Sequence, residues 1–239
     1  MRNEEAPYHL SMLKNIINVH HGFTKSSQCI NSILGSHDQA GNRQGGQTDG
    51  KHGKYFVSLF GGRDNWHARA QCRMWYALQA VSRGLPMLFM GSENLQGDFW
   101  NVQKGKEMNW TLLHDQLATQ MRALVAAANN LRLSFAELTE EQQQPAFVHE
   151  NAANRVLAFT RGQLLMVLNC GEGQWDLGCT YTLMSPYSSG TNLKLIFNSQ
   201  EESFGGWRGS GGPPVLQAAA GGALSLVLPK WALLVYQKL

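Results

Sequence analysis

The stretch Trp66-His-Ala-Arg-Ala-Gln-Cys-Arg-Met-Trp-Tyr-Ala-Leu-Gln-Ala-Val81-Ser-Arg-Gly84-Leu85-Pro-Met-Leu-Phe-Met90-Gly91 decides the fold. Apolar residues recur at helical spacing over its first part: Trp66, Ala70, Met74, Ala77, Leu78 and Val81. With Asp64 or Asn65 as N-cap and Gly84 as C-terminal stop, this pattern predicts an amphipathic helix. The continuous apolar run Leu85–Met90 then predicts a strand buried on both faces of a parallel sheet, with Pro86 tolerable near its start.

Upstream of the helix, the sequence predicts a second strand and a long loop. The apolar-leaning segment 29–34 ends in Gly35-Ser-His-Asp38, and Gly, Gln and Asp then dominate as far as Arg63. Strand, polar loop, helix and strand in this order make a βαβ unit, which places the two strands parallel and side by side.

Downstream, the residue pattern of the chain changes once. A second helical stripe comprises Leu113, Leu117, Met121, Leu124, Ala128 and Leu131. The charged, Gln-rich run 140–144 and Pro145 then read as a connection between domains. We therefore expect two domains, residues 1–143 and 144–239.

The second domain is expected to be all-β, without helices after about Leu138. Short β-prone runs separated by Gly, Pro and Ser occur at 155–160, 163–168, 193–198, 224–228 and 231–236. Arg161-Gly162 is predicted as a two-residue hairpin turn, in which Gly supplies the positive φ. This spacing of strands is typical of an antiparallel sandwich.

Composition limits the classes of ligand. The 239 residues are 43% hydrophobic and 15% charged, and the net charge of +3 comes from dispersed basic residues, so nucleic acid is not an expected partner. Seven Trp, six Tyr and ten Phe suit a neutral, hydroxyl-rich ligand, although most of these aromatic residues are expected in the core.

The cysteines and the chain's start limit its location. Cys29, Cys72, Cys170 and Cys179 are scattered without a CxxC pair or zinc-ligand spacing, and read as reduced thiols, so no metal site is expected. Neither a secretory signal nor a membrane-spanning run is visible. We expect a soluble intracellular protein, cytoplasmic or plastidic, that does not bind membranes.

His37 and Asp38 are the best candidates for chemistry because they follow the first strand. At the carboxyl ends of parallel barrel strands, side chains point into the active site. A carboxylate can stabilise positive charge on a sugar ring while an imidazole binds a ring hydroxyl. From the tripeptide alone, an ordinary loop with a capping Asp is the better interpretation.

Three segments resemble a known family. Asn31-Ser-Ile-Leu-Gly-Ser-His-Asp-Gln39 resembles the fourth conserved region of glycoside hydrolase family 13, in the SHD(E/Q) form of glycogen and starch branching enzymes. Gly84–Glu93 looks like the family's eighth barrel strand, followed by Gly97-Asp-Phe-Trp-Asn101. Phe197–Gly206 is similar to the segment before the Gly-Gly turn of the C-terminal domain.

The resemblance implies a fold, a reaction and a site. The fold is the last part of a (β/α)8 barrel followed by an all-β sandwich. The reaction, without cofactor or metal, is cleavage of α-1,4 linkages in glycogen, amylose or amylopectin and transfer of the chain to form α-1,6 branches. Asp38 is implied as the third catalytic carboxylate and His37 as a sugar ligand; Gln39, Glu93 and Trp100 lie where the family lines its substrate groove.

The chain departs from the family in several ways. Ser92, Asn94-Leu95 and Gln39 replace the residues usual in branching enzymes. A retaining enzyme also needs a nucleophile and an acid/base, and the family carries both upstream of the SHD motif, where this chain has neither. We therefore expect the chain alone to be inactive. An amylase-type hydrolase, such as a malto-oligosyltrehalose trehalohydrolase, and a non-catalytic glucan-binding module stay as alternatives.

Overall fold

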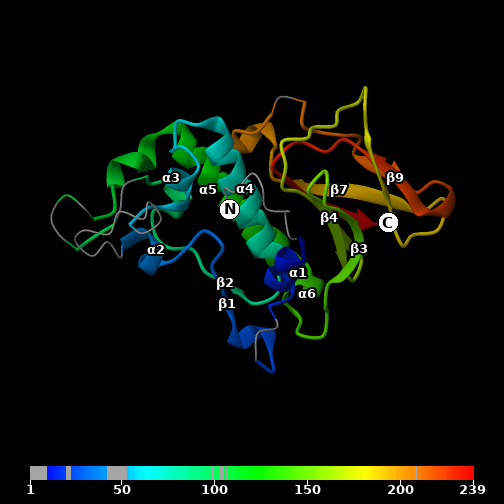
Figure 1. The fold of residues 1–239 in the computed structure, drawn as a ribbon, viewed down its shortest axis with the longest axis horizontal. Helices are drawn as coiled ribbons and strands as arrows, with labels where there is room; N and C mark the ends of the chain where they lie inside the picture. The colour runs from blue at the N-terminus through cyan, green and yellow to red at the C-terminus, as the bar shows by residue number, and fades with distance from the viewer. Residues whose placement is uncertain are drawn as a thin grey trace.

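The structure is a computed structural model that describes residues 10–19, 23–41, 53–97, 100–102, 105, 107–207 and 209–239. Most helices gather on one side of the molecule and the antiparallel β-sheets on the other, with α4 near the middle (Figure 1). The α-helices are α1 Leu10–Asn18, α2 His37–Gly41, α3 Phe56–Leu59, α4 Trp66–Val81, α5 Gln116–Ser134 and α6 Ala136–Thr139. The strands are β1 Ile30–Asn31, β2 Leu85–Pro86, β3 Ala146–Asn151, β4 Val156–Arg161, β5 Leu164–Asn169, β6 Tyr181–Met184, β7 Asn192–Asn198, β8 Val215–Gln217, β9 Ala223–Leu226 and β10 Ala232–Lys238.

Helix α4 is the central element and matches the predicted helix. The side chain of Asn65 caps it by accepting from the N–H groups of His67, at 2.9 Å, and Ala68. Such a cap satisfies donors that have no partner inside the helix. Every residue from Ala70 to Val81 is buried, because α4 packs between α5 and the sheet that contains β10. The helix is therefore covered on all sides along most of its length.

Strands β1 and β2 pair in parallel, as the βαβ pattern predicts, but the pairing is short. Ile30 lies opposite Leu85 and Asn31 opposite Pro86. The prediction of a strand buried on both faces over 85–90 is wrong: only two residues form a strand, and Leu85 and Met90 are 51% and 42% exposed. Ile30 is 65% exposed, so apolar side chains of both strands face away from the body of the chain. No further strand covers them among the described residues.

The other helices correct the sequence reading in two places. Helix α1 was not predicted, although Leu10, Leu13 and Ile17 form a buried stripe at helical spacing. The predicted polar loop contains the short helices α2 and α3, while its residues 42–52 lie outside the described part. Helix α5 matches the second predicted stripe, except that Leu113 lies in the preceding 3₁₀ turn Trp110–His114.

The C-terminal part is an antiparallel β-structure. Six strands form one sheet in the order β3-β4-β5-β10-β7-β8, and β6 pairs with β9 in a second, small sheet. The hairpin between β4 and β5 is confirmed, but Arg161 pairs with Leu164, so the turn residues are Gly162 and Gln163 rather than Arg161 and Gly162. Gly162 has a φ of 56°, as a primed turn needs.

Two apolar cores lie on opposite faces of the six-stranded sheet, because side chains alternate between the faces along each strand. Leu157, Phe159 and Met166 point to the core that they share with α1, α4 and α5. Ala158 and Val167 point to the core that the small sheet covers. The helices and the C-terminal sheet thus share one core.

Two arginines, Arg132 and Arg161, hold carbonyl groups at the C-terminal end of α4, which the helix itself leaves without partners, and a third, Arg83, directly follows this end. Arg132 donates to the carbonyls of Ala80, Ser82 and Gly84, at 2.7 to 2.8 Å. Arg161 donates to Val81 at 3.0 Å and also to Leu138 and Gln143. Arg83 bonds the side chain of Glu141 at 2.8 Å. This end of α4 is therefore tied to α5, β4 and the connection at 140–144.

Within the described ranges, no helix is both long and apolar enough to cross a membrane. Cys29, Cys72, Cys170 and Cys179 form no disulfide bonds; Cys179 is exposed and the other three are buried. Burial raises the pKa of the Cys72 thiol to about 12, which makes it unreactive at neutral pH.

Candidate functional site

His37 and Asp38 are the first two residues of α2, six and seven residues after the end of β1. The N–H of Asp38 donates to the hydroxyl oxygen of Ser36 at 3.2 Å, which fixes the start of the helical turn. The His37 Nε2 and Asp38 Oδ1 atoms lie 3.3 Å apart, and the two side chains are 68% and 63% exposed. An imidazole and a carboxylate thus stand together at the surface.

Gln39 closes the turn that carries this pair. Its side-chain oxygen accepts from the N–H and from the hydroxyl of Ser36, both at 2.7 Å. The Gln39 residue is exposed. Its side chain therefore holds Ser36 through its oxygen.

Phe89 connects the SHD turn to the segment that follows β2. Its ring centroid lies 6.4 Å from that of His37, 5.9 Å from that of Tyr55 and 5.6 Å from that of Trp100. The Trp100 ring meets the Phe89 ring edge-on, at 88°. The backbone N–H of Trp100 donates to the carbonyl of Ala40 at 3.0 Å. His37 and Trp100 therefore share one aromatic wall, whereas residues 98 and 99 of the predicted Trp loop lie outside the described residues.

Glu93 lies in the 3₁₀ turn Ser92–Asn94, directly after this wall. One carboxylate oxygen accepts from the N–H of Gly91 at 2.9 Å, and the other from the side-chain amide of Asn94 at 3.0 Å. Arg122 from α5 donates in turn to the Asn94 side-chain oxygen at 2.6 Å. The carboxylate of Glu93 is thus used to shape the turn.

Sequence reasoning missed Phe89 and Tyr55 as members of the site. The Tyr55 hydroxyl donates to the carbonyl of Met90 at 2.9 Å. Burial, together with the nearby Glu93 carboxylate, raises the pKa of Tyr55, so it stays a neutral donor. Phe89 was read only as part of a buried run, although its place at the end of a parallel strand was a usable signal.

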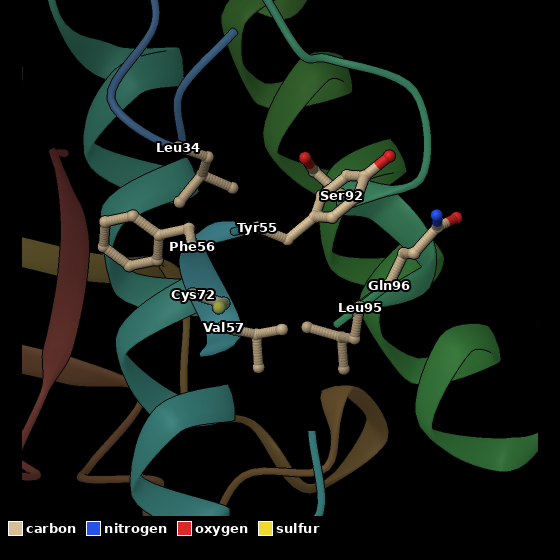
Figure 2. Close-up of a pocket in the computed structure, with 8 residues that line it drawn as sticks. All are labelled: Leu34, Tyr55, Phe56, Val57, Cys72, Ser92, Leu95 and Gln96. Atoms are coloured by element: carbon tan, nitrogen blue, oxygen red, sulfur yellow. The ribbon is translucent and has the colours of Figure 1, made fainter. Parts of the chain in front are cut away.

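A small cavity lies beside Tyr55 (Figure 2). Its lining residues are Leu34, Tyr55, Phe56, Val57, Cys72, Ser92, Leu95 and Gln96. The cavity measures about 10 Å³, which is room for one water molecule and not for a sugar ring. A sugar ring therefore does not fit this cavity, whereas the side chains of His37, Asp38 and Gln39 lie on the exposed surface.

The geometry of this face suits recognition of a neutral, hydroxyl-rich ligand. It offers a carboxylate, an imidazole and an amide beside partly buried aromatic rings. No group of three or more His, Cys, Asp or Glu side chains gathers into a metal-binding cluster in the part of the chain that the structure describes. The face presents one carboxylate, that of Asp38, beside the imidazole of His37.

The amino-acid sequence is similar to branching enzymes. Residues 147–238 match the family of the alpha amylase C-terminal all-beta domain. The 1,4-alpha-glucan branching enzyme GlgB of a Bradyrhizobium strain is 26% identical over 191 residues, which are 76% of this chain and 26% of that enzyme. The GlgB of Bordetella pertussis is 34% identical over 96 residues, 38% of this chain and 13% of that enzyme. The chain thus spans about a quarter of the length of the Bradyrhizobium enzyme.

Solved structures of alpha-amylases share the fold. An alpha-amylase from Anoxybacillus superposes over 87% of this chain and 37% of its own, with a TM-score of 0.56 and 14% sequence identity. The alpha-amylase of Geobacillus thermoleovorans, solved with acarbose, covers 88% of this chain and 38% of its own, with a TM-score of 0.55 and 12% identity. The predicted resemblance is confirmed: the chain is similar in sequence to 1,4-alpha-glucan branching enzymes, and its residues 147–238 match the alpha amylase C-terminal all-beta domain.

Proposed function

We propose that this chain is the C-terminal part of a 1,4-α-glucan branching enzyme, which cleaves α-1,4 linkages and transfers the released chain to a 6-hydroxyl group. The observation that carries the proposal is the meeting of two segments. The SHD turn after β1 and the apolar run after β2 come together at Phe89, with the His37 ring 6.4 Å away. Similarity to the branching enzymes of Bradyrhizobium and Bordetella supports this reaction over simple hydrolysis.

Residues 1–143 are proposed to form the last part of a (β/α)8 barrel, and residues 144–239 its C-terminal domain. The parallel pairing of β1 and β2 supports this proposal, since barrel strands are all parallel. The exposure of Ile30 and Leu85 supports it as well, because neighbouring strands and helices would cover these side chains. The shape of the alpha-amylases that superpose on most of the chain agrees with it.

We assign roles within the site as part of the same proposal. Asp38 stabilises the positive charge of the transition state by its field, without forming a bond. His37 binds the sugar at the cleaved linkage, and Gln39, Glu93 and Trp100 line the groove for glycogen, amylose or amylopectin. The nucleophile and the acid/base come from a polypeptide segment outside these 239 residues.

The test uses the protein in which this chain completes a barrel, with amylose as substrate. New α-1,6 linkages, quantified after debranching, distinguish branching from hydrolysis, which produces only reducing ends. Asp38→Asn should lower the branching rate on the order of 10²- to 10³-fold, because a charge that stabilises the transition state is lost.

Asp176→Asn in the C-terminal part is the matched control and should leave the rate unchanged. The purified 239-residue chain alone should neither branch nor hydrolyse amylose. Reducing ends without new branches would favour an amylase-type hydrolase. Tight amylopectin binding by the isolated chain, with an unaffected Asp38→Asn variant, would favour a glucan-binding module. The location in the cytoplasm or a plastid stays a prediction.

A further inference from the structure

Gln79 is a buried polar residue that the proposed site has not used. It lies in the last turn and a half of α4 with 0% of its surface exposed. Its side-chain oxygen accepts from the N–H of Ile33 at 2.7 Å, and its side-chain NH₂ donates to the carbonyl of Met87 at 2.8 Å. One amide therefore joins Ile33, the second residue after β1, to Met87, the first residue after β2.

This position is where the ladder between the two strands should continue. Leu85 N–H donates to the carbonyl of Cys29, and Met87 N–H to that of Asn31, at 2.8 and 2.9 Å. The bonds of a parallel ladder are evenly spaced, so the next rung would run directly from the N–H of Ile33 to the carbonyl of Met87. The Gln79 amide stands between these two groups and bonds both.

An inserted amide has a geometric consequence. It satisfies the two backbone groups that the broken ladder would leave buried without partners, a loss that costs about 1 to 3 kcal/mol for each group. It also separates the strands by the width of one planar amide. From this point one strand leads to the SHD turn and the other to Phe89.

We propose that Gln79 is a positioning residue. It ends the ladder between β1 and β2 by inserting its amide, and it thereby sets the distance between the SHD turn and the Phe89 ring. The functional part of this inference rests on the proposed branching activity. The geometric part concerns the chain itself and is measurable without substrate.

The first measurement uses proton NOE spectroscopy on the 239-residue chain to monitor the contact between the His37 and Phe89 rings. Gln79→Met keeps the side-chain volume and removes both hydrogen bonds, so the His37–Phe89 cross-peaks should disappear. Gln79→Glu supplies a group that accepts when ionised and both accepts and donates when protonated. Its cross-peaks should be absent at high pH and return as the pH falls and the new carboxyl takes up a proton, while those of the unaltered chain persist across that range.

Gln71→Met is the matched control, because Gln71 lies on the same helix and is 8% exposed. It should leave the cross-peaks intact even if the melting temperature falls. Should Gln79→Met fail to fold, the comparison of Gln79→Glu at two pH values decides alone. Cross-peaks that persist in Gln79→Met, or that show no pH dependence in Gln79→Glu, would overturn the proposal.

The second measurement uses the protein with a complete barrel and amylose. Gln79→Met should lower kcat on the order of 10- to 100-fold, as small misplacements of catalytic groups do, with KM nearly unchanged. The fall in kcat of Gln79→Glu should be partly reversed at low pH. An unaltered protein that makes no branches overturns the proposed function, while the NOE arm still decides whether Gln79 sets the geometry.

Discussion

The two parts of the chain satisfy their backbone groups in different ways. The C-terminal part does so by strand pairing, in a six-stranded antiparallel sheet whose central strand β5 is buried along its whole length. Among the described residues of the N-terminal part, one parallel pair of two-residue strands is present, and side chains bond backbone groups that strand pairing leaves without partners. Gln79, Arg132 and Arg161 each bond two or more backbone groups. A region with open strand edges thus depends on single polar side chains, whereas the sheet distributes its stability over many pairs.

The largest expected effect tests which part of the chain is stabilised by the burial of apolar side chains. Leu168→Ala in β5 should lower the free energy of unfolding by about 2 to 5 kcal/mol, because Leu168 is 0% exposed and truncation leaves a cavity. Ile30→Ala in β1, at 65% exposure, should change it by less than about 0.5 kcal/mol. Urea unfolding of both variants measures the difference. Equal losses would mean that Ile30 is covered in solution, and the contrast between the regions would disappear.

The next effect tests the dependence on single polar groups. Arg161→Met should cost about 2 to 3 kcal/mol, because the carbonyls of Val81, Leu138 and Gln143 lose a buried charged donor. Urea unfolding again provides the measurement. Lys194→Met, on the exposed face of β7, is the control and should be within about 0.5 kcal/mol of the unaltered chain. A loss of stability no larger than that of Lys194→Met would show that water replaces the guanidinium as the donor to these carbonyls.

A smaller effect is expected at the start of α5. The Asp115 side chain accepts from the N–H of Ala118 at 2.8 Å and from Arg63 at 2.6 Å. Asp115→Ala should cost about 1 kcal/mol, as the loss of an N-cap does. Asp115→Asn, which keeps a capping oxygen and removes the charge, should recover most of this loss in thermal unfolding. If Asn recovers nothing, the ion pair with Arg63 dominates instead of the cap.

The smallest effect concerns the connection at 140–144. The N–H of Ser26 donates to Glu141, and this bond, with those from the Ser26 hydroxyl and Arg83, holds the pKa of Glu141 below its usual range. A depressed pKa stabilises the fold above the ordinary glutamate pKa, and that contribution is lost as the pH falls through the depressed value. Glu141→Gln should therefore be less stable than the unaltered chain at pH 7 and nearly equal to it in strong acid. A stability difference that is independent of pH would contradict this account.

Sequence reasoning predicted the elements that carry regular patterns and missed those that depend on tertiary contacts. The helical stripe of α4 and the β4–β5 hairpin are local signals, and both are present. Strands β3, β6 and β8 were not predicted: β6 and β8 have only four and three residues, and β3 mixes apolar residues with His149 and Glu150. The exposure of Leu85 and Met90 could not be predicted, because the sequence of an apolar run does not show whether other strands and helices cover it.

The candidate site was predictable as residue types and not as contacts. The SHD motif pointed to His37 and Asp38 through a resemblance, and their roles stay predictions. Gln79 carries no local signal, because a glutamine on a helix is ordinary until two strand ends are seen on either side of its amide. Gln39 and Glu93 were predicted as substrate contacts, and their oxygens prove to be engaged in local turns. Motif spacing predicts the type of side chain at a position and does not predict which partner that side chain bonds.

The shared core between the helices and the inner face of the sheet has a consequence for cooperativity. Residues of α4, such as Met74 and Leu78, pack in one cluster with Phe159 and Leu233 of the sheet. Neither layer can lose its partner without exposing this face to water, so the two layers should melt together as a single calorimetric transition. Cleavage of the backbone in the 140–144 connection should accordingly leave the two pieces associated.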